Sequence, residues 1–298
     1  MTAREQGYLL LTAQLGDTEC KPLTLPQLYK LAKAVSRVTP PTEDRDLALE
    51  DLLAVGLDRE FSRRVLSLLD REEQLQWYLK RASRGGCAPV TRIGKGYPDR
   101  LRKLGKDAPA VLWGKGNWDI LQKRCVSVVG SRELLPDNME FAYEAGKQAA
   151  LQGYVMVSGN ARGADRTAQD ACLDHGGCVI SVVPGSLADL PERQGVLYLS
   201  EEGADSSFTP YRALRRNRII HALGEKTFVA QCTLEKGGTW DGTRNNLRTR
   251  LSPVWCCDDG SEAARELAQM GAGLLSKEQL KDFSALKELE LNFMDADS

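Results

Sequence analysis

Hydrophobic positions in the first part of the chain recur at helical spacing. In the segment Leu25–Val35, Leu28, Leu31 and Val35 fall on one face of a helix. The same kind of pattern predicts three further helices, at Leu47–Val55, Phe61–Leu69 and Gln74–Ala82. We therefore expect a small all-α N-terminal domain over residues 1–85.

The pair of short helices around Val55-Gly56-Leu57 resembles helix-hairpin-helix and sterile-alpha-motif modules. Two roles stay open for such a domain at this point. It is either a helical scaffold for the rest of the chain or a module that touches DNA directly.

From residue 86 onward the pattern changes to short, continuous apolar runs, which are typical of strands buried on both faces. Five such runs stand at Arg124–Val129, Tyr154–Val157, Cys178–Val183, Lys226–Cys232 and Val254–Cys257. Helical stretches separate them at Asn138–Leu151, Gly163–His175 and Trp240–Arg250. This alternation predicts an α/β fold with a doubly wound, mostly parallel sheet over residues 86–260. Residues 261–298 are expected to add C-terminal helices and a tail, with one amphipathic helix over Ser276–Phe293.

Polar, glycine-rich loops follow four of these strands. In chain order they are Gly130-Ser131-Arg132, Ser158-Gly159-Asn160-Ala161-Arg162-Gly163, Pro184-Gly185-Ser186 and Lys236-Gly237-Gly238-Thr239. The carboxyl ends of parallel strands meet at one edge of the sheet, where ligands of such folds bind. Glycine lets the backbone approach a ligand closely, and arginine binds phosphate oxygens in a bidentate manner. The four loops predict a site for an anionic, phosphate-bearing ligand.

The charge of the chain is unevenly distributed. Forty Lys+Arg against 41 Asp+Glu give a net charge of -1 over 298 residues, which excludes a protein held to nucleic acid by bulk charge. The segment 207–252 nevertheless holds nine basic and three acidic residues, a surplus of six. Three aromatic residues in or near it are candidates for stacking on bases: Phe208, Tyr211 and Trp240.

Composition also bears on location and metals. Neither a run of the roughly 20 apolar residues that span a bilayer nor a signal peptide is recognised, so we expect a cytoplasmic protein with no membrane partner. The eight cysteines form no C-x-x-C pair, and only His175 and His221 could complete a zinc site. We expect reduced thiols, no metal and no cofactor.

A series of motifs in a fixed order resembles the DprA/Smf family of DNA-processing proteins over about residues 97–260. The series runs Tyr97-Pro98-Asp99-Arg100-Leu101, Ala108–Asn117, Val128–Arg132, Ser158–Asp165, Leu199-Ser200-Glu201 and Arg216-Asn217-Arg218-Ile219-Ile220. Three sites depart from the family pattern: Gln169 stands where a His is usual, Leu190-Pro191 replaces a Tyr-Pro, and Lys236–Trp240 replaces a Ser-Gly-Ser loop.

The resemblance implies an extended Rossmann-like domain that binds single-stranded DNA, forms a homodimer and helps to load a RecA-type recombinase, without catalysis. It also implies that the anion pocket is lined by Ser131, Arg132, Ser158, Gly159, Arg162, Gly163, Asn217 and Arg218. The loop residues Gly130, Lys236, Gly237, Gly238 and Thr239, with Arg215 of the basic segment, complete the candidate site. Asp165 is expected to cap the second loop rather than to bind the ligand.

A second class of function stays open, namely a nucleotide-binding sensor or a nucleotide N-glycosidic hydrolase of a related Rossmann-like family. The loop Lys236–Thr239 is similar to the Gly-Gly-x-Gly-Thr loop of nucleotide phosphoribohydrolases. Such hydrolysis needs a placed carboxylate. The family's glutamate after the loop is missing here, which leaves Asp241 and Glu201 as the nearest substitutes.

Overall fold

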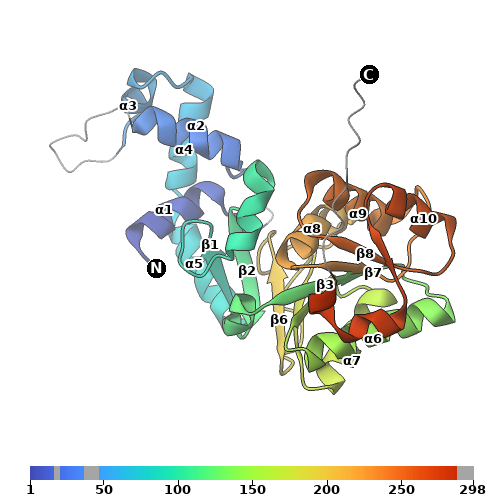
Figure 1. The fold of residues 1–298 in the computed structure, drawn as a ribbon. Helices are drawn as coiled ribbons and strands as arrows, with labels where there is room; N and C mark the ends of the chain where they lie inside the picture. Colours follow the sequence, from blue (N-terminus) through green and yellow to red (C-terminus); the bar gives the residue numbers. More distant parts are fainter. Residues whose placement is uncertain (17–20, 37–46, 287–298) are drawn as a thin grey trace, which may run out of the picture.

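The computed structural model describes residues 1–16, 21–36 and 47–286. At its centre lies a nine-stranded sheet in the order β1-β2-β6-β5-β4-β3-β7-β8-β9 (Figure 1). The strands are β1 (Cys87–Thr91), β2 (Val111–Gly116), β3 (Cys125–Val129), β4 (Val155–Ser158), β5 (Cys178–Val182), β6 (Val196–Ser200), β7 (Thr227–Val229), β8 (Val254–Cys257) and β9 (Gly273–Leu275). The strands from β6 to β9 in this order pair in parallel, and β2 and β1 extend the sheet antiparallel. The expected α/β fold with a mostly parallel, Rossmann-like sheet is confirmed.

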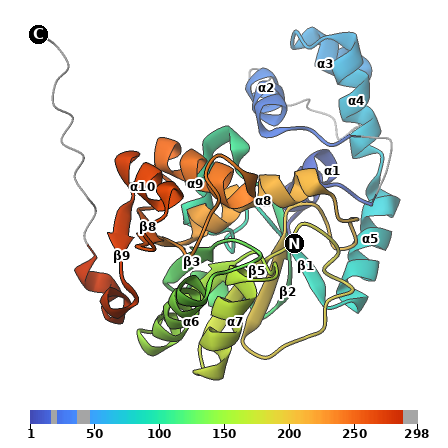
Figure 2. The same ribbon diagram turned by 90° about the vertical axis from the view of Figure 1, so that its right-hand side faces the viewer.

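Helices cover both faces of this sheet, which explains why its central strands, such as β3, β4 and β6, are buried along their whole length. On one face lie α6 (Pro136–Leu151) and α7 (Ala164–Asp174), and on the other α8 (Pro210–Leu223), α9 (Gly237–Thr249) and α10 (Glu262–Gln269) (Figure 2). Within β3, Val126 and Val128 join the core under α6 and α7, while Val129 joins the core under α8 and α9. All five residues of β3 are buried, as expected for a central strand.

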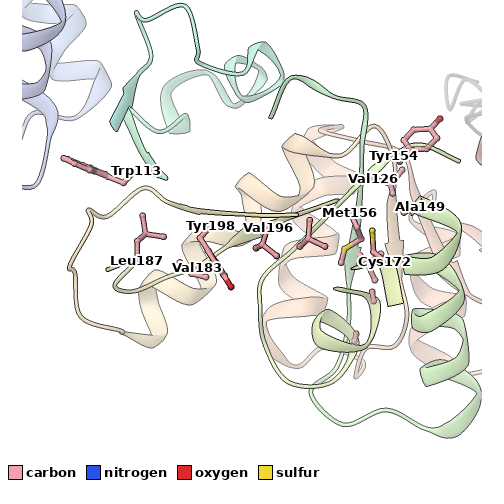
Figure 3. Close-up of a cluster of buried hydrophobic side chains, with 14 of the residues drawn as sticks. Trp113, Val126, Ala149, Tyr154, Met156, Cys172, Val183, Leu187, Val196 and Tyr198 are labelled. Atoms are coloured by element: carbon pink, nitrogen blue, oxygen red, sulfur yellow. The ribbon is translucent and has the colours of Figure 1, made fainter. Parts of the chain in front are cut away.

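The N-terminal helices are α1 (Ala3–Thr12), α2 (Leu25–Val35), α3 (Leu49–Ala54), α4 (Arg59–Leu69) and α5 (Glu72–Arg84). Helices α2 to α4 enclose a small core of their own. Helices α1 and α5 instead share the core of the sheet, where Tyr78 meets Trp113 edge to face at 5.1 Å. Figure 3 shows Trp113 at one end of this core and Met156 and Cys172 at the other. The four predicted helices are present, while α1 was not predicted.

Periodicity did not predict four strands of the sheet: β1, β2, β6 and β9. β1 contains Pro89, and β2 contains Gly114 and Gly116, so neither resembles a continuous β-branched run. β9 is only three residues long and lies after Gly260, where helices and a tail were expected. The sheet therefore continues beyond the range 86–260.

The amphipathic helix expected over Ser276–Phe293 is not formed in its described part. Residues 276–286 form two short 3-10 helices, η3 (Lys277–Lys281) and η4 (Phe283–Ala285), and the remainder lies outside the described residues. Phe283 is fully buried against Phe228 at 4.8 Å, and its N–H donates to Gln152 Oε1 at 2.7 Å. Anchoring Phe283 in the core breaks the helical path at this point.

The thiols of the described residues are free, and most are buried. Burial raises the pKa of Cys125 and Cys172 to about 12, so both stay protonated and behave as small hydrophobes. Among the described residues, no group of three or more His, Cys, Asp or Glu side chains is placed to hold a metal ion. Over the same residues, no helix is both long enough and apolar enough to cross a membrane.

Candidate functional site

The carboxyl ends of β3, β4, β5 and β7 lie at one edge of the sheet, because these four strands are parallel. Two adjoining hollows of about 470 and 680 Å³ open there. They share five lining residues: Arg132, Ala161, Phe208, Ala213 and Arg216. We call the two hollows together the carboxyl-edge groove. All four polar loops predicted from the sequence contribute to it.

Arg216 is the buried cation of the groove. Its residue is 8% exposed, yet it lines both hollows. Nη1 donates to the Val182 carbonyl at 2.7 Å, whereas Nε is buried with no hydrogen-bond partner among the described residues. Burial lowers the pKa of this guanidinium, Asp165 acts to raise it, and Arg132 lowers it further. A buried donor without a partner carries a free-energy cost, and a buried cation that lines a groove favours an anion there.

Gly159, directly after β4, makes room for this guanidinium. A Cβ at position 159 would lie 1.6 Å from Arg216 Nη1. Only glycine therefore allows the loop and the arginine to occupy their present positions.

Asp165, in the first turn of α7, holds the same loop. Its Oδ2 accepts hydrogen bonds from the N–H groups of Gly159 at 3.0 Å and Ala161 at 3.1 Å. Burial raises the pKa of this carboxyl, and Arg216 and the two amides act in the opposite direction. The expectation that Asp165 caps the second loop is confirmed.

Ser158 and Gly163 shape the groove without lining either hollow. Ser158 is fully buried, and its Oγ accepts a hydrogen bond from Gln169 Nε2 at 2.7 Å. Gly163 has φ +81°, and a Cβ there would lie 2.3 Å from the Ser131 carbonyl oxygen. These two residues were expected in the pocket, and the structure places them behind it.

The first and fourth loops are tied to each other across the groove. Thr239 Oγ1 donates to the Gly130 carbonyl at 3.0 Å, and Asn217 Nδ2 donates to the Gly238 carbonyl at 3.1 Å. Helix α9 begins at Gly237, and no side chain caps its first turn. Its N-terminal amides thus add to the positive potential of a groove that Ser131 and Lys236 also line.

Two exposed arginines stand at the opening of the groove. Arg132 lines both hollows, and Arg162 lines the smaller one. Arg162 Nη2 pairs with Glu133 at 2.9 Å in a solvent-exposed contact, which phosphate could replace at little cost.

Arg215 and Arg218, both expected to bind phosphate, line neither hollow. Arg218 donates two hydrogen bonds to Glu201, at 2.6 and 2.5 Å, and a third to the Asp107 carbonyl at 2.8 Å. Burial acts to lower the pKa of Arg218, but the bonds to Glu201 prevail and raise it. Arg215 pairs with Glu201 at 3.4 Å and with Glu202 at 3.6 Å.

These ion pairs correct the charge predicted for the basic segment. Glu201 and Glu202 lie just before residue 207, outside the range that was counted. They pair with three arginines of the segment: Arg212, Arg215 and Arg218. The positive charge left to the groove therefore comes from a few residues rather than from the whole segment.

The three aromatic candidates have different positions. Phe208 lines both hollows and is 60% exposed, and Tyr211 in the first turn of α8 is 71% exposed. Trp240 is 1% exposed and belongs to the core under α9. Trp240 as a stacking platform was a wrong prediction, since its helical position points into the sheet.

The two carboxylates proposed for a hydrolase do not face the groove. The Glu201 side chain is 4% exposed and bound to Arg218, and Asp241 lines neither hollow. Among the described lining residues, Asp165 supplies the carboxylate, and it is occupied by backbone amides. Neither carboxylate named for hydrolysis is therefore placed to meet a ligand in the groove.

Sequence reasoning missed Arg216 as the central donor. The signal was present in the motif Arg216-Asn217-Arg218, where alternate residues of a helix point in different directions. The prediction took Arg218 from that motif, and the structure turns Arg216 into the groove instead.

This chain is similar to known proteins over most of its sheet domain. Residues 89–285 match the family model described as DNA recombination-mediator protein A. The DNA processing protein DprA of Streptococcus pneumoniae is 32% identical over 196 residues, 61% of this chain and 69% of the relative. DprA of Bacillus subtilis is 30% identical over 165 residues, and that match spans 52% of this chain and 55% of the relative.

Two solved structures share the fold at similar identity. The structure of DprA from S. pneumoniae has a TM-score of 0.67 at 26% identity, covering 85% of this chain and 90% of that one. A structure of DNA processing protein A from Helicobacter pylori, described for its single-stranded DNA binding mode, has a TM-score of 0.55 at 25% identity. It covers 65% of this chain and 94% of that one.

Proposed function

Because this chain belongs to the DNA recombination-mediator protein A family, we propose that it binds single-stranded DNA with the strand's phosphates in the carboxyl-edge groove. The observation that carries the proposal is the buried guanidinium of Arg216, whose Nε lacks a partner among the described residues. A phosphate in the groove would approach this guanidinium, because Arg216 lines both hollows, and would offset its charge.

The surroundings of Arg216 favour a phosphodiester strand. Arg132 and Lys236 add charge at the same groove, and the first turn of α9 adds backbone donors. Phosphate contacts carry no base information, so binding should show little sequence preference. Phe208, exposed at the edge of both hollows, offers an aromatic ring to an unpaired base.

The proposal includes two partners that family membership supports: a second copy of this chain and a RecA-type recombinase. A mediator acts by placing a recombinase on a strand, so it needs no catalytic turnover of its own. Light scattering of the purified protein tests the homodimer. The rate at which the recombinase assembles a filament on single-stranded DNA bound by this protein tests the loading step.

The DNA-binding test uses fluorescence anisotropy of a labelled oligonucleotide with wild type, Arg132→Ala and Arg265→Ala. Arg132 is exposed in the groove, whereas Arg265 is exposed on α10 and lines neither hollow. We expect Arg132→Ala to weaken binding about tenfold at about 50 mM salt for every sequence tested, and Arg265→Ala to bind like wild type.

Two results would count against the proposal. One is the lack of binding by wild type at micromolar protein and low salt. The other is an equal loss in Arg132→Ala and Arg265→Ala, which would indicate unspecific surface attraction rather than a groove.

A further inference from the structure

Trp77 on α5 is a large aromatic side chain in an unusual position. It is 58% exposed, whereas Trp113, Trp240 and Trp255 are each 8% exposed or less. Trp77 lies far from the carboxyl-edge groove in sequence, and nothing in the groove's architecture accounts for it. A single exposed ring needs no explanation by itself, so the residues around Trp77 decide whether it is a binding surface.

On this face of α5, the residues after Trp77 are basic, while the exposed Glu73 precedes it by four positions. Positions i, i+3, i+4 and i+7 of a helix share one face, and on α5 these are Trp77, Lys80, Arg81 and Arg84, all exposed. We call them the outer face of α5. The opposite side of the helix holds the buried residues Leu75, Tyr78 and Ala82. An aromatic ring among cations is the composition of a platform for single-stranded nucleic acid.

Arg81 fixes the ring of Trp77. Its guanidinium carbon lies 4.6 Å from the centre of the Trp77 ring, a cation–π contact, and the same guanidinium pairs with Asp205. The ring is thus oriented before any ligand arrives. The outer charge of this face rests with Lys80 and Arg84, since Asp205 offsets that of Arg81.

Asp205 connects the outer face of α5 to the groove. Tyr78 donates its hydroxyl proton to Asp205 Oδ1 at 2.5 Å and accepts a hydrogen bond from the Ala204 N–H at 3.0 Å. Three residues after Asp205 comes Phe208, which lines both hollows. A fully extended chain advances at most about 3.6 Å per residue, so the two Cα atoms are within about 11 Å of each other.

A second segment makes the same connection. Lys115 Nζ donates to the carbonyl oxygens of Ala188 at 3.3 Å and Leu190 at 2.7 Å, and Leu190 lines the smaller hollow. A Cβ on Gly85, which follows α5, would lie 3.4 Å from Ala188 Cβ. Two stretches of chain that border the groove, around Ala188 and around Asp205, therefore both lie beside α5.

We propose that single-stranded DNA leaving the groove past Phe208 stacks a base on Trp77, while Lys80 and Arg84 contact the phosphates beside it. This inference rests on the proposed function and extends it to the N-terminal helices. It makes α5 an outer DNA subsite in addition to its packing on the sheet.

The test compares two oligonucleotides of about 6 and about 20 nucleotides, within and beyond the range of one binding groove. Wild type, Trp77→Ala and Trp77→Phe are titrated by anisotropy, with Tyr29→Ala as the control, since Tyr29 is 52% exposed on α2. We expect Trp77→Ala to weaken binding of the long oligonucleotide about fivefold or more and to leave the short one unchanged. Trp77→Phe should keep most of the affinity, because phenylalanine also offers a ring.

A double variant, Lys80→Ala with Arg84→Ala, keeps the ring and removes the charge. It should lower the affinity for the long oligonucleotide only, and should do so less at high salt. Quenching of tryptophan fluorescence by the long oligonucleotide should be reduced in Trp77→Phe.

The outcomes separate the two proposals. If Trp77→Ala and the double variant bind the long oligonucleotide like wild type while Arg132→Ala loses affinity, the α5 subsite is wrong and the groove stands. If Trp77→Ala loses affinity for both lengths equally, the subsite is also wrong, because removing the ring then weakens binding within the groove itself. If wild type binds neither length, both proposals fail.

Discussion

The Cα of Gly159 and the guanidinium of Arg216 are in such close contact that a Cβ on residue 159 would lie 1.6 Å from Nη1. This contact joins the loop after β4 to α8, two elements that the sequence keeps more than fifty residues apart. It also sets the position of the donor on which the proposed DNA site depends.

Gly159→Ala should therefore displace Arg216 without removing it. The arginine would have to give up its bond to the Val182 carbonyl, so we expect a loss of DNA affinity close to that of Arg216→Ala and a loss of about 1–2 kcal/mol in stability. Anisotropy titration and urea unfolding measure the two effects.

Gly7→Ala is the matched control for this substitution. Gly7 lies in α1, and a Cβ there would meet nothing within 4 Å. Wild-type affinity in Gly159→Ala would show that Arg216 does not need its observed position.

Arg218→Ala should affect stability rather than binding. The Arg218 and Glu201 side chains are 12% and 4% exposed, so the substitution leaves a buried carboxylate without its main partner. We expect a loss of about 3 kcal/mol in the free energy of unfolding and wild-type affinity for DNA in the folded protein.

Arg215→Ala provides the comparison within the same network. Its side chain is 45% exposed, and its pair with Glu201 is longer, so the expected loss of stability is below about 1 kcal/mol. A strong loss of DNA affinity in Arg218→Ala at temperatures where it is folded would contradict the placement of this arginine.

The salt dependence of binding should report the number of phosphates at the groove. Each contact to single-stranded DNA contributes about 0.7 to the slope of log K against log salt. Arg132→Ala and Lys236→Ala should each make this negative slope shallower by about 0.7, and the double variant should make it shallower by about 1.4. An unchanged slope in the double variant would place the phosphates elsewhere.

His221 should make stability depend on pH. Burial lowers its pKa to about 4, against an ordinary value of 6.5, and the ring is bonded to Asn246 and Thr227. Between pH 4 and 6.5 the unfolded chain therefore binds a proton that the folded protein does not. Stability rises with pH across this window, and from pH 7 to pH 5 the loss amounts to about 2 kcal/mol.

Denaturant unfolding of wild type and His221→Asn at pH 7 and pH 5 measures this effect. The variant has no group titrating at position 221, so its stability should change less between the two values. Equal losses of stability in both proteins between pH 7 and pH 5 would mean that His221 is protonated in the folded protein at pH 5.

The sheet and its loops could be predicted because they depend on local pattern. A strand covered on both faces must be apolar at every position, as in Cys125–Val129, and a loop that approaches a ligand needs glycine, as at Gly130 and Gly159. Periodicity missed β1 and β2, since Pro89, Gly114 and Gly116 interrupt the pattern and cross-strand pairing compensates for them.

The identity of the site residues depended on the tertiary structure. The motif Arg216-Asn217-Arg218 contains two arginines of equal chemistry, and only the packing of α8 decides that one enters the groove and the other meets Glu201. The net charge counted over residues 207–252 overestimated the positive charge of the site for the same reason. Glu201 and Glu202 lie outside that segment in the sequence but pair with its arginines in the fold.

The sequence by itself determined the parallel sheet, the edge at which its polar loops gather and the family to which the chain belongs. These follow from the spacing of residues along the chain, which folding does not alter. Which arginine is buried, which aromatic ring is exposed and how α5 meets the groove were decided only by the tertiary structure, because they depend on the direction of side chains and on partners distant in sequence.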